Sequence, residues 1–411
     1  MKRIYSFIIL CFLSSCAHQQ QLEQDILQIQ EKYELMGGIV VTFDDREILS
    51  QIPFGVADLK QNIPVTDQTF FRVASISKTI TAMAFMLLVD DEKVSLDDDI
   101  SEILGYTVRQ PDFPQQPITP RMLLSHTSSL VDGKHYDDFL SALAKDTVPP
   151  LASLIQEGGR FYSQSNFIQH APGSFFSYSN INYVILGTLV EKISQQRFDI
   201  FCEENLFKPL SIEGSFSVEN LSDSASVAVL YRKINGNWKA QADSAMIPIQ
   251  RMPLLTNYIP GTNAVLFSPQ GGLRITATDL SKIWQLILNE GQHKGKQIIS
   301  PSVIKQMTQA SYEYDGTNGD HAQGLFNSWG LGIHRIIGNK GLDKVFEQSE
   351  LVYGHPGEAY GLVSGAYIDP DKKYGVIFIT NGSGKGYQNG ERSAFYEVEA
   401  AIYQAVSRSL E

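Results

Sequence analysis

The apolar and polar positions of the chain predict a buried helix early in the sequence. Between Ile80 and Leu88 the apolar residues recur at i, i+3, i+4, i+7 and i+8, and Phe85 and Met86 add apolar groups to the other faces. A helix that is apolar almost all round is buried on every side. We therefore expect a helix starting near Ile76 to lie at the centre of the protein.

Alternating and β-branched runs on both sides of this helix predict strands. Residues 38–43 and 47–49 flank a polar turn, as do residues 362–368 and 374–380. A third hairpin, formed by residues 227–233 and 238–241, is indicated by Asn235-Gly236-Asn237, because Asn-Gly favours a tight turn between antiparallel strands.

Helical patterns at 183–193 and 276–289 complete the prediction of an α+β fold, in which an antiparallel sheet flanked by helices is interrupted by a mainly helical region. The expected organisation is a linker and N-terminal helix over 16–36, a discontinuous α/β region over 37–99 and 255–411, and the mainly helical region over 100–254.

The N-terminus has the pattern of an export signal. Lys2 and Arg3 precede an apolar run from Ile4 to Leu13, which is too short to span a membrane. The following Ser14-Ser15-Cys16 completes a segment that resembles a bacterial lipobox. We expect residues 1–15 to be a signal peptide and Cys16 to be lipidated, which predicts a cell-envelope lipoprotein facing the periplasm or the exterior. An ordinary cleaved signal with an incidental cysteine remains the alternative.

Charge and cysteine content narrow the possible partners. The 411 residues carry a net charge of -12 without a basic cluster, so no nucleic-acid partner is expected. If Cys11 is removed and Cys16 acylated, only Cys202 remains, and its apolar neighbours indicate a buried, inert thiol rather than a nucleophile. The histidines show no metal-binding spacing, so neither a metal nor another cofactor is expected.

Ser75 and Lys78 are the first candidates for catalysis. Their spacing at a helix start puts a hydroxyl and an amine on one face, where burial could leave the lysine neutral and able to accept the serine proton. The same spacing occurs at Ser302 and Lys305, so this motif alone does not identify the site.

The order of two further motifs distinguishes the two pairs. Tyr178-Ser179-Asn180 and His355-Pro356-Gly357 both follow Ser75 in the chain. After Ser302 the only Tyr-x-Asn begins at Tyr387, and no His-x-Gly or Lys-x-Gly follows it. The set that begins at Ser75 thus supplies a helix start, a turn before a helix and a glycine-flanked strand, which could together form a catalytic cleft.

With these surroundings, the chain resembles the class C-like branch of the serine β-lactamase and penicillin-binding-protein superfamily. The resemblance extends over about residues 37–400 and lies in the segments Phe71-Arg72-Val73-Ala74-Ser75-Ile76-Ser77-Lys78, Leu123-Leu124-Ser125-His126-Thr127-Ser128-Ser129-Leu130, Pro172-Gly173, Tyr178-Ser179-Asn180, Gly271-Gly272-Leu273 and Trp329-Gly330-Leu331-Gly332.

The resemblance implies that Ser75 is the nucleophile and that Lys78 and Tyr178 share the proton transfers. It also implies that Asn180 orients the substrate and that the backbone N–H groups of Ser75 and Glu358 form the oxyanion hole. Which of Lys78 and Tyr178 is the general base stays open. A lysine ammonium beside the phenol would lower the tyrosine pKa, and a phenolate would raise that of the lysine.

Two histidines need separate interpretation. His126 lies between Ser125 and Thr127, and we interpret it as a hydrogen-bonded support of the cleft wall. His355 occupies the position of a lysine in many members of the superfamily, so recognition of a substrate carboxylate is in doubt. With Asn180, Gly357 and Glu358, it is still expected among the substrate-binding residues.

The resulting hypothesis is an exported serine hydrolase that acylates Ser75. Its substrate would be a small molecule or a peptide, such as that of peptidoglycan, with a D-residue amide, a β-lactam or a short ester as the cleaved group. The alternative is a catalytically silent protein of the same fold that acts as a ligand sensor or binding lipoprotein. The sequence does not distinguish peptidase, esterase and β-lactamase activity, and it leaves the oligomeric state and the anchoring membrane open.

Overall fold

The structure is a computed structural model that describes residues 2–143, 148–222, 226–243, 254–338, 344–390 and 393–410, with side chains from residue 18 onward. Its main element is a nine-stranded antiparallel sheet in the order β11-β12-β13-β14-β15-β16-β1-β2-β3. The strands are β1 (Gly37–Asp44), β2 (Ile48–Asp58), β3 (Ile63–Pro64), β11 (Tyr312–Glu313), β12 (Ser328–Trp329), β13 (His334–Ile337), β14 (Leu351–Ala359), β15 (Leu362–Asp369) and β16 (Tyr374–Thr380).

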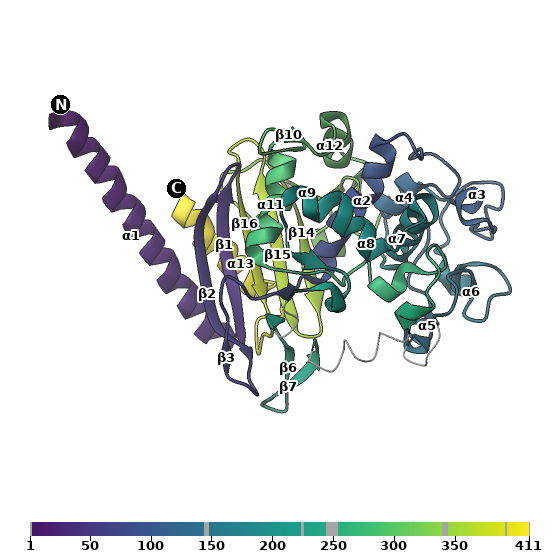
Figure 1. Cartoon of the computed structure of the whole chain (residues 1–411), viewed down its shortest axis with the longest axis horizontal. Helices are drawn as coiled ribbons and strands as arrows, with labels where there is room; N and C mark the ends of the chain where they lie inside the picture. The colour runs from purple at the N-terminus through teal and green to yellow at the C-terminus, as the bar shows by residue number, and fades with distance from the viewer. Residues whose placement is uncertain are drawn as a thin grey trace.

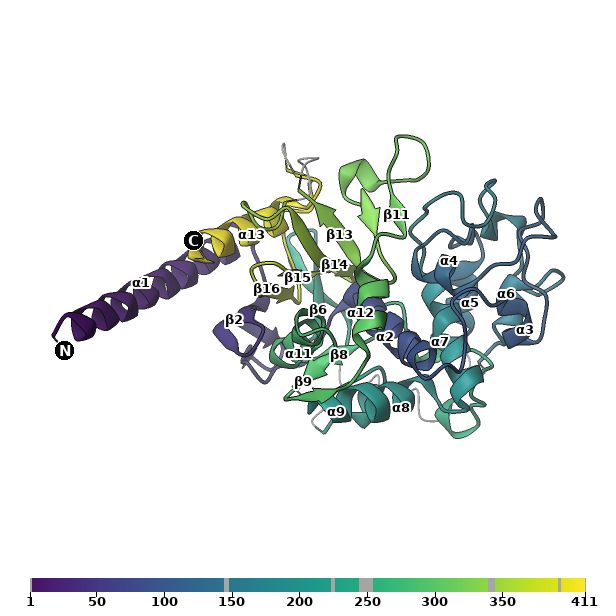
Figure 2. The ribbon, with the colours of Figure 1, turned by 90° about the horizontal axis from the view of Figure 1, so that it is seen from above.

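Helices cover both faces of this sheet (Figures 1 and 2). α1 (Lys2–Tyr33) and α13 (Glu397–Leu410) pack against each other and lie on one face, while α11 (Ala277–Leu288) lies on the other. The side chains of β16 alternate accordingly, since Val376 and Phe378 belong to the core under α1 and α13, and Ile377 and Ile379 to the core under α11. This period of two is the pattern of a strand that is buried on both faces.

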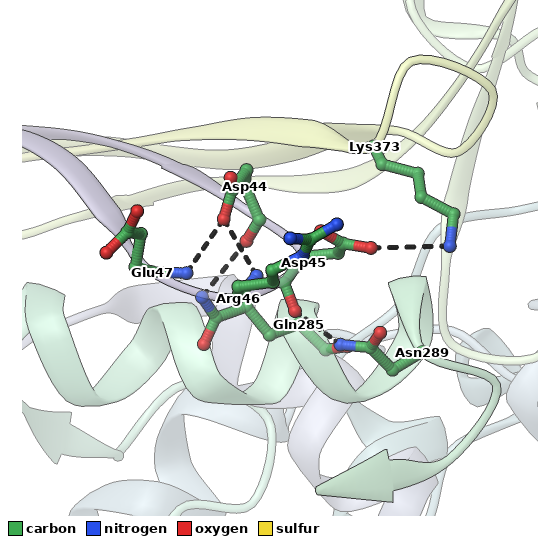
Figure 3. A network of polar contacts seen from close by, with 7 residues as sticks. All are labelled: Asp44, Asp45, Arg46, Glu47, Gln285, Asn289 and Lys373. Carbon is green, nitrogen blue, oxygen red and sulfur yellow. Dashed lines mark hydrogen bonds and ion pairs between the residues drawn. The ribbon is translucent and has the colours of Figure 1, made fainter. Parts of the chain in front are cut away.

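Polar contacts hold α11 against the turn between β1 and β2 (Figure 3). The carboxylate of Asp44 accepts hydrogen bonds from the backbone N–H groups of Arg46 and Glu47 at 2.8 and 2.7 Å, which closes the turn. Gln285 of α11 and Asn289, the residue just after its end, then donate to the turn carbonyls of Asp44 and Asp45 at 3.0 and 2.6 Å. These bonds fix α11 relative to the strands.

The helical part lies beside the face of the sheet that α11 covers, with α2 (Ser77–Asp90) and α7 (Ile181–Ser194) packed together at its centre (Figure 1). Around them lie α3 (Ile100–Leu104), α4 (Pro120–Leu124), α5 (Tyr136–Ala142), α6 (Ala152–Ile155), α8 (Phe198–Cys202), α9 (Lys208–Leu210) and, near α2, α12 (Pro301–Thr308). Smaller sheets are formed by β4 (Phe71–Arg72), β5 (Gly214–Ser215) and β8 (Arg274–Ile275), by β6 (Leu230–Ile234) and β7 (Asn237–Ala242), and by β9 (Gln292–His293) and β10 (Lys296–Gln297).

The α+β prediction is confirmed, including the buried helix α2 and the three hairpins. Ile234 pairs with Asn237, so Asn235 and Gly236 alone form the turn, with positive φ angles of 50° and 78° that suit these residue types. Strands β5, β6 and β7 lie within residues 100–254, which were expected to be mainly helical.

The predicted linker is the main difference from expectation. Residues 16–36 begin inside one continuous helix, α1, rather than in a linker. Leu22, Ile26, Ile29 and Tyr33 are buried in the core shared with α13, and this packing explains the helix better than the weak propensity of a polar segment would. The side chain of Cys16 lies outside the described ones, so its lipidation stays a prediction. None of the described helices is both long and apolar enough for a membrane span.

Candidate active site

Ser75 lies in a short 3₁₀-helix, Ala74–Ile76, between β4 and the start of α2. The preceding residue, Ala74, has a positive φ of 47°, a conformation that non-glycine residues rarely adopt. β14 packs closely on this turn, because a Cβ atom at Gly357 would lie 2.7 Å from the carbonyl oxygen of Val73. Only a glycine therefore lets the strand approach the backbone that holds Ser75.

Lys78 is completely buried one turn after Ser75. Its Nζ lies 3.0 Å from Ser75 Oγ, 2.9 Å from Asn180 Oδ1 and 2.8 Å from the carbonyl oxygen of Gln270. Burial lowers the pKa of Lys78 from 10.5 to about 7, although the negative charge of Asp132 partly opposes this effect. Near neutral pH a substantial fraction of this amine is therefore uncharged.

The three partners of Lys78 determine the direction of the hydrogen bond to Ser75. The Gln270 carbonyl can only accept, and the Asn180 amide is oriented by its Nδ2, which donates to Asp132 at 2.8 Å, so that Oδ1 accepts from Lys78. A neutral amine has two N–H donors and one lone pair. Once both donors point to these acceptors, the lone pair faces Ser75 and can receive its hydroxyl proton.

Tyr178 approaches Ser75 from the loop before α7. The pKa of Tyr178 is raised by burial, and its side-chain hydrogen bond to Ser75 opposes that shift only in part. The net shift is opposite to the lowering that an adjacent ammonium would cause, because loss of hydration dominates for both groups: it disfavours the ammonium of Lys78 and the phenolate of Tyr178 alike. Tyr178 is thus a protonated phenol that can donate, while Lys78 is the group that can accept.

Asp132 is a residue of the site that sequence reasoning missed. Its carboxylate accepts from the backbone N–H groups of Asn180 and Ile181 at 3.2 and 2.9 Å, and from the Ser179 hydroxyl at 3.1 Å. A carboxylate is stabilised at a helix N-terminus, where backbone donors have no partner within the helix. Asp132 therefore fixes the loop that carries Tyr178 and Asn180; the only sequence signal was its position shortly after the segment 123–130.

His126 also contacts the loop that carries Tyr178 and Asn180. Its Nδ1 accepts from the backbone N–H of Ser179 at 3.1 Å, and its ring lies against Tyr178 with the centroids 4.5 Å apart. Burial holds the pKa of His126 well below its usual value, so the imidazole is neutral. These contacts match its interpretation as a support of the cleft wall.

The residues of the third motif, His355-Pro356-Gly357, and the following Glu358 do not all line the cleft. Gly357 and the exposed Glu358 line the cleft, whereas His355 is completely buried and is absent from the described lining. The His355 ring lies beside Tyr178, with the centroids 6.1 Å apart, and its Nδ1–H donates to the Pro356 carbonyl at 2.6 Å. Burial lowers its pKa well below the usual value, so His355 supplies no cation here.

Two cavities meet at Ser75, Asn180 and Glu358. The first, of about 480 Å³, is also lined by Tyr178, Phe326 and the segment that leads into α13. The second, of about 430 Å³, is lined by Asp132, Gln270 and the arginines Arg72 and Arg232. A substrate could therefore place one half on each side of the Ser75 hydroxyl.

The other Ser-x-x-Lys pair has none of these features. Ser302 and Lys305 are both exposed on α12.

Cys202 is completely buried, as expected, and burial raises its pKa well above the usual value, so it has little thiolate character. Within the described residues no group of three or more His, Cys, Asp or Glu side chains could hold a metal ion.

Comparison with known proteins agrees with this geometry. The family model described as Beta-lactamase matches residues 22–397. Penicillin-binding protein 4* of Bacillus subtilis (strain 168) is 29% identical over 192 residues, which are 44% of this chain and 39% of that protein. The match thus spans well under half of that relative.

Solved structures show the same fold over nearly the whole chain. EstCE1, described as a hydrolase with promiscuous acyltransferase activity, matches with a TM-score of 0.68 at 22% identity and covers 96% of this chain and 100% of its own. D-amino acid amidase from Ochrobactrum anthropi SV3, complexed with L-phenylalanine, matches with a TM-score of 0.65 at 20% identity, covering 97% and 99%.

Proposed function

The chain belongs to the Beta-lactamase family, and on this premise we propose that it is a serine hydrolase that cleaves an amide or ester through an acyl-enzyme on Ser75. The observation that carries the proposal is the position of the buried Lys78 amine, 3.0 Å from Ser75 Oγ with its other two partners fixed as acceptors.

In the first half-reaction Ser75 Oγ attacks the substrate carbonyl carbon while its proton passes to the neutral Lys78. The tetrahedral oxyanion is stabilised by the backbone N–H groups of Ser75 and Glu358. The bond to the leaving group then breaks, and the leaving group takes a proton from Tyr178, whose phenolate is reprotonated by the Lys78 ammonium. In the second half-reaction water attacks the acyl carbon and gives a proton to neutral Lys78. The bond from this carbon to Ser75 Oγ then breaks, Oγ takes the proton from Lys78, and the acid product leaves.

The acyl donor that the site favours is a short ester or an amide of a D-amino acid, as in peptidoglycan-type peptides. A free carboxylate next to the cleaved bond is disfavoured, because the buried His355 replaces a cation and Glu358 brings a negative charge to the wall. Penicillins and substrates that end in a carboxylate are therefore expected to react more slowly than neutral esters. The silent binding protein is the weaker alternative, since the buried Lys78 amine beside Ser75, with its lowered pKa, supports turnover.

Labelling of the nucleophile tests the proposal directly. A fluorophosphonate probe should modify the wild-type protein at Ser75 with the expected mass increase, and Ser75→Ala should abolish labelling. Ser302→Ala is the matched control, because it removes the serine of the other Ser-x-x-Lys pair and should label normally. Hydrolysis of a p-nitrophenyl ester should follow the same order. Absence of labelling and turnover in the wild type would leave the silent binding protein as the better account.

We further propose that the protein is exported and anchored to a membrane through a lipid on Cys16. The apolar run 4–13 and the segment Leu13-Ser14-Ser15-Cys16 support this. Metabolic labelling with a clickable palmitate analogue should mark the wild type but not Cys16→Ser, whereas Cys202→Ser should be labelled like the wild type. Equal labelling of Cys16→Ser would contradict the anchor.

A further inference from the structure

The first cavity contains two carboxylates that the proposed reaction does not use. Glu358 accepts a hydrogen bond from the Tyr396 hydroxyl at 2.7 Å, and Glu399, in the first turn of α13, accepts one from the Tyr396 backbone N–H at 3.0 Å through Oε2. All three residues line the cavity together with Ser75 and Tyr178. Two acidic side chains thus share this cavity with the nucleophile.

Glu399 has an oxygen that is free to bind a ligand. The residue is only 5% exposed, yet it lines the cavity, and its Oε1 has no hydrogen-bond partner among the described residues. The oxygen faces the cavity, and a negative charge in such a largely buried place is destabilised unless a partner compensates it. Burial and the nearby charge of Glu358 raise the pKa of Glu399 to about 8, so its carboxyl is largely protonated near neutral pH, and a cation bound beside it would favour the carboxylate form.

The remaining lining suits an organic cation. No Lys or Arg occurs among the described residues that line this cavity, in contrast to the second cavity, which contains Arg72 and Arg232. Aromatic side chains of Tyr178, Phe326 and Tyr396 form part of its surface. Aromatic faces next to carboxylates attract ammonium groups, primary or quaternary, through charge and cation–π interactions.

The position of Tyr178 indicates which half of the substrate enters this cavity. Its hydroxyl is the protonated group that can donate to a leaving group, and Tyr178 lines the first cavity but does not occur in the described lining of the second. Resting on the proposed acyl-serine hydrolysis, we propose that Glu358, Tyr396 and Glu399 bind an organic cation carried by the leaving group of the substrate. The acyl half then occupies the second cavity.

A pair of isosteric esters tests this assignment. Choline acetate carries a quaternary ammonium on its leaving group, and 3,3-dimethylbutyl acetate has the same shape without the charge. The readout is the ratio of their kcat/KM values, because comparing this ratio between variants cancels the intrinsic reactivity of the two esters. We expect the ratio to fall at least about tenfold from wild type to the double variant Glu358→Gln/Glu399→Gln, with Glu399→Gln intermediate.

Two controls separate a specific subsite from a general effect of charge. Glu290→Gln removes an exposed carboxylate after the end of α11, outside the described lining of this cavity, and should leave the ratio unchanged. A second ester pair places the charge on the acyl side: the methyl esters of trimethylammonioacetate and of 3,3-dimethylbutanoate. Their ratio should respond little to the double variant, and an equal response of both pairs would overturn the proposal.

The outcomes also distinguish this inference from the proposed function. If Glu399→Gln still reacts with fluorophosphonate at the wild-type rate and hydrolyses the neutral ester, but the ratio does not move, the cation subsite is wrong and the hydrolase stands. If the wild type neither labels nor hydrolyses either ester, the hydrolase itself is wrong. Labelling at Ser75 and the melting temperature show that each variant is folded.

Discussion

Replacement of the buried lysine tests the central claim about the site, because it should change stability in a way that depends on pH. In Lys78→Met a side chain of similar length without a charge occupies a position that is completely buried in the wild type. The variant should lose Ser75 acylation, since no group then accepts the hydroxyl proton. Its stability relative to the wild type should change with pH only because Lys78 titrates differently in the folded and unfolded states.

The sign and size of this pH-dependent difference in stability follow from the lowered pKa of Lys78. Folding lowers the pKa of Lys78 from 10.5 to about 7, so between these values the unfolded chain binds the additional proton. The free energy of unfolding of the wild type then rises with pH, by about 1.4 kcal/mol per unit relative to a variant without this amine. From pH 7.5 to 9.0 we expect a relative gain of about 2 kcal/mol for the wild type.

Urea unfolding at a series of pH values between 6.5 and 9.5 measures this difference for both proteins. At the lower end Lys78→Met should be the more stable protein, because the wild type there carries the cost of a buried charge, although loss of the hydrogen bonds to Asn180 and Gln270 reduces the gain. Lys305→Met is the matched control, because this lysine is exposed and its removal should give a curve parallel to the wild type.

Parallel curves for Lys78→Met and the wild type would refute the reasoning. They would mean that Lys78 keeps its ordinary pKa in the folded protein and is an ammonium near neutral pH. It could then not accept the Ser75 proton. The pH dependence of kcat/KM in the wild type is a second check. If the pKa of Lys78 is lowered, kcat/KM should fall toward acidic pH with an apparent pKa near 7.

Three further predictions concern the supports of the site. Asp132→Asn should lower kcat/KM about tenfold and move the acidic limb to lower pH, since the negative charge of Asp132 raises the pKa of Lys78; an unchanged pH profile would contradict this. Gly357→Ala should lower kcat about a hundredfold with the fold retained in circular dichroism, because the new Cβ would press on the Val73 carbonyl, whereas Gly390→Ala, whose Cβ would meet ordinary contacts, should be near wild type. The stability of the wild type, measured by thermal unfolding, should decline as the pH rises from 5 to 7. Glu191→Gln should remove this decline. Burial raises the pKa of Glu191 from 4.5 to about 7, so the folded state binds the additional proton in this window and loses about 2 kcal/mol of stability across it.

The sequence by itself determined the elements whose pattern is local. The all-apolar run at α2, the alternation in β15 and β16 and the Asn235-Gly236 turn follow from periodicity and backbone preference, which act over a few residues. The order of the motifs around Ser75, Tyr178 and His355 likewise predicted the family and which of two Ser-x-x-Lys pairs matters. These signals need no knowledge of what packs on them.

Only the tertiary structure decided what depends on contacts between distant segments. The sequence predicts a linker before Leu22, but this segment continues the same helix, whose residues from Leu22 onward pack on α13 from the other end of the chain. Asp132 gave almost no sequence signal, because its role arises from the helix N-terminus that folding brings to it. The lowered pKa of Lys78, the burial of His355 and the meeting of Glu358 with Glu399 all depend on how much water the fold excludes at each position, which no local pattern encodes.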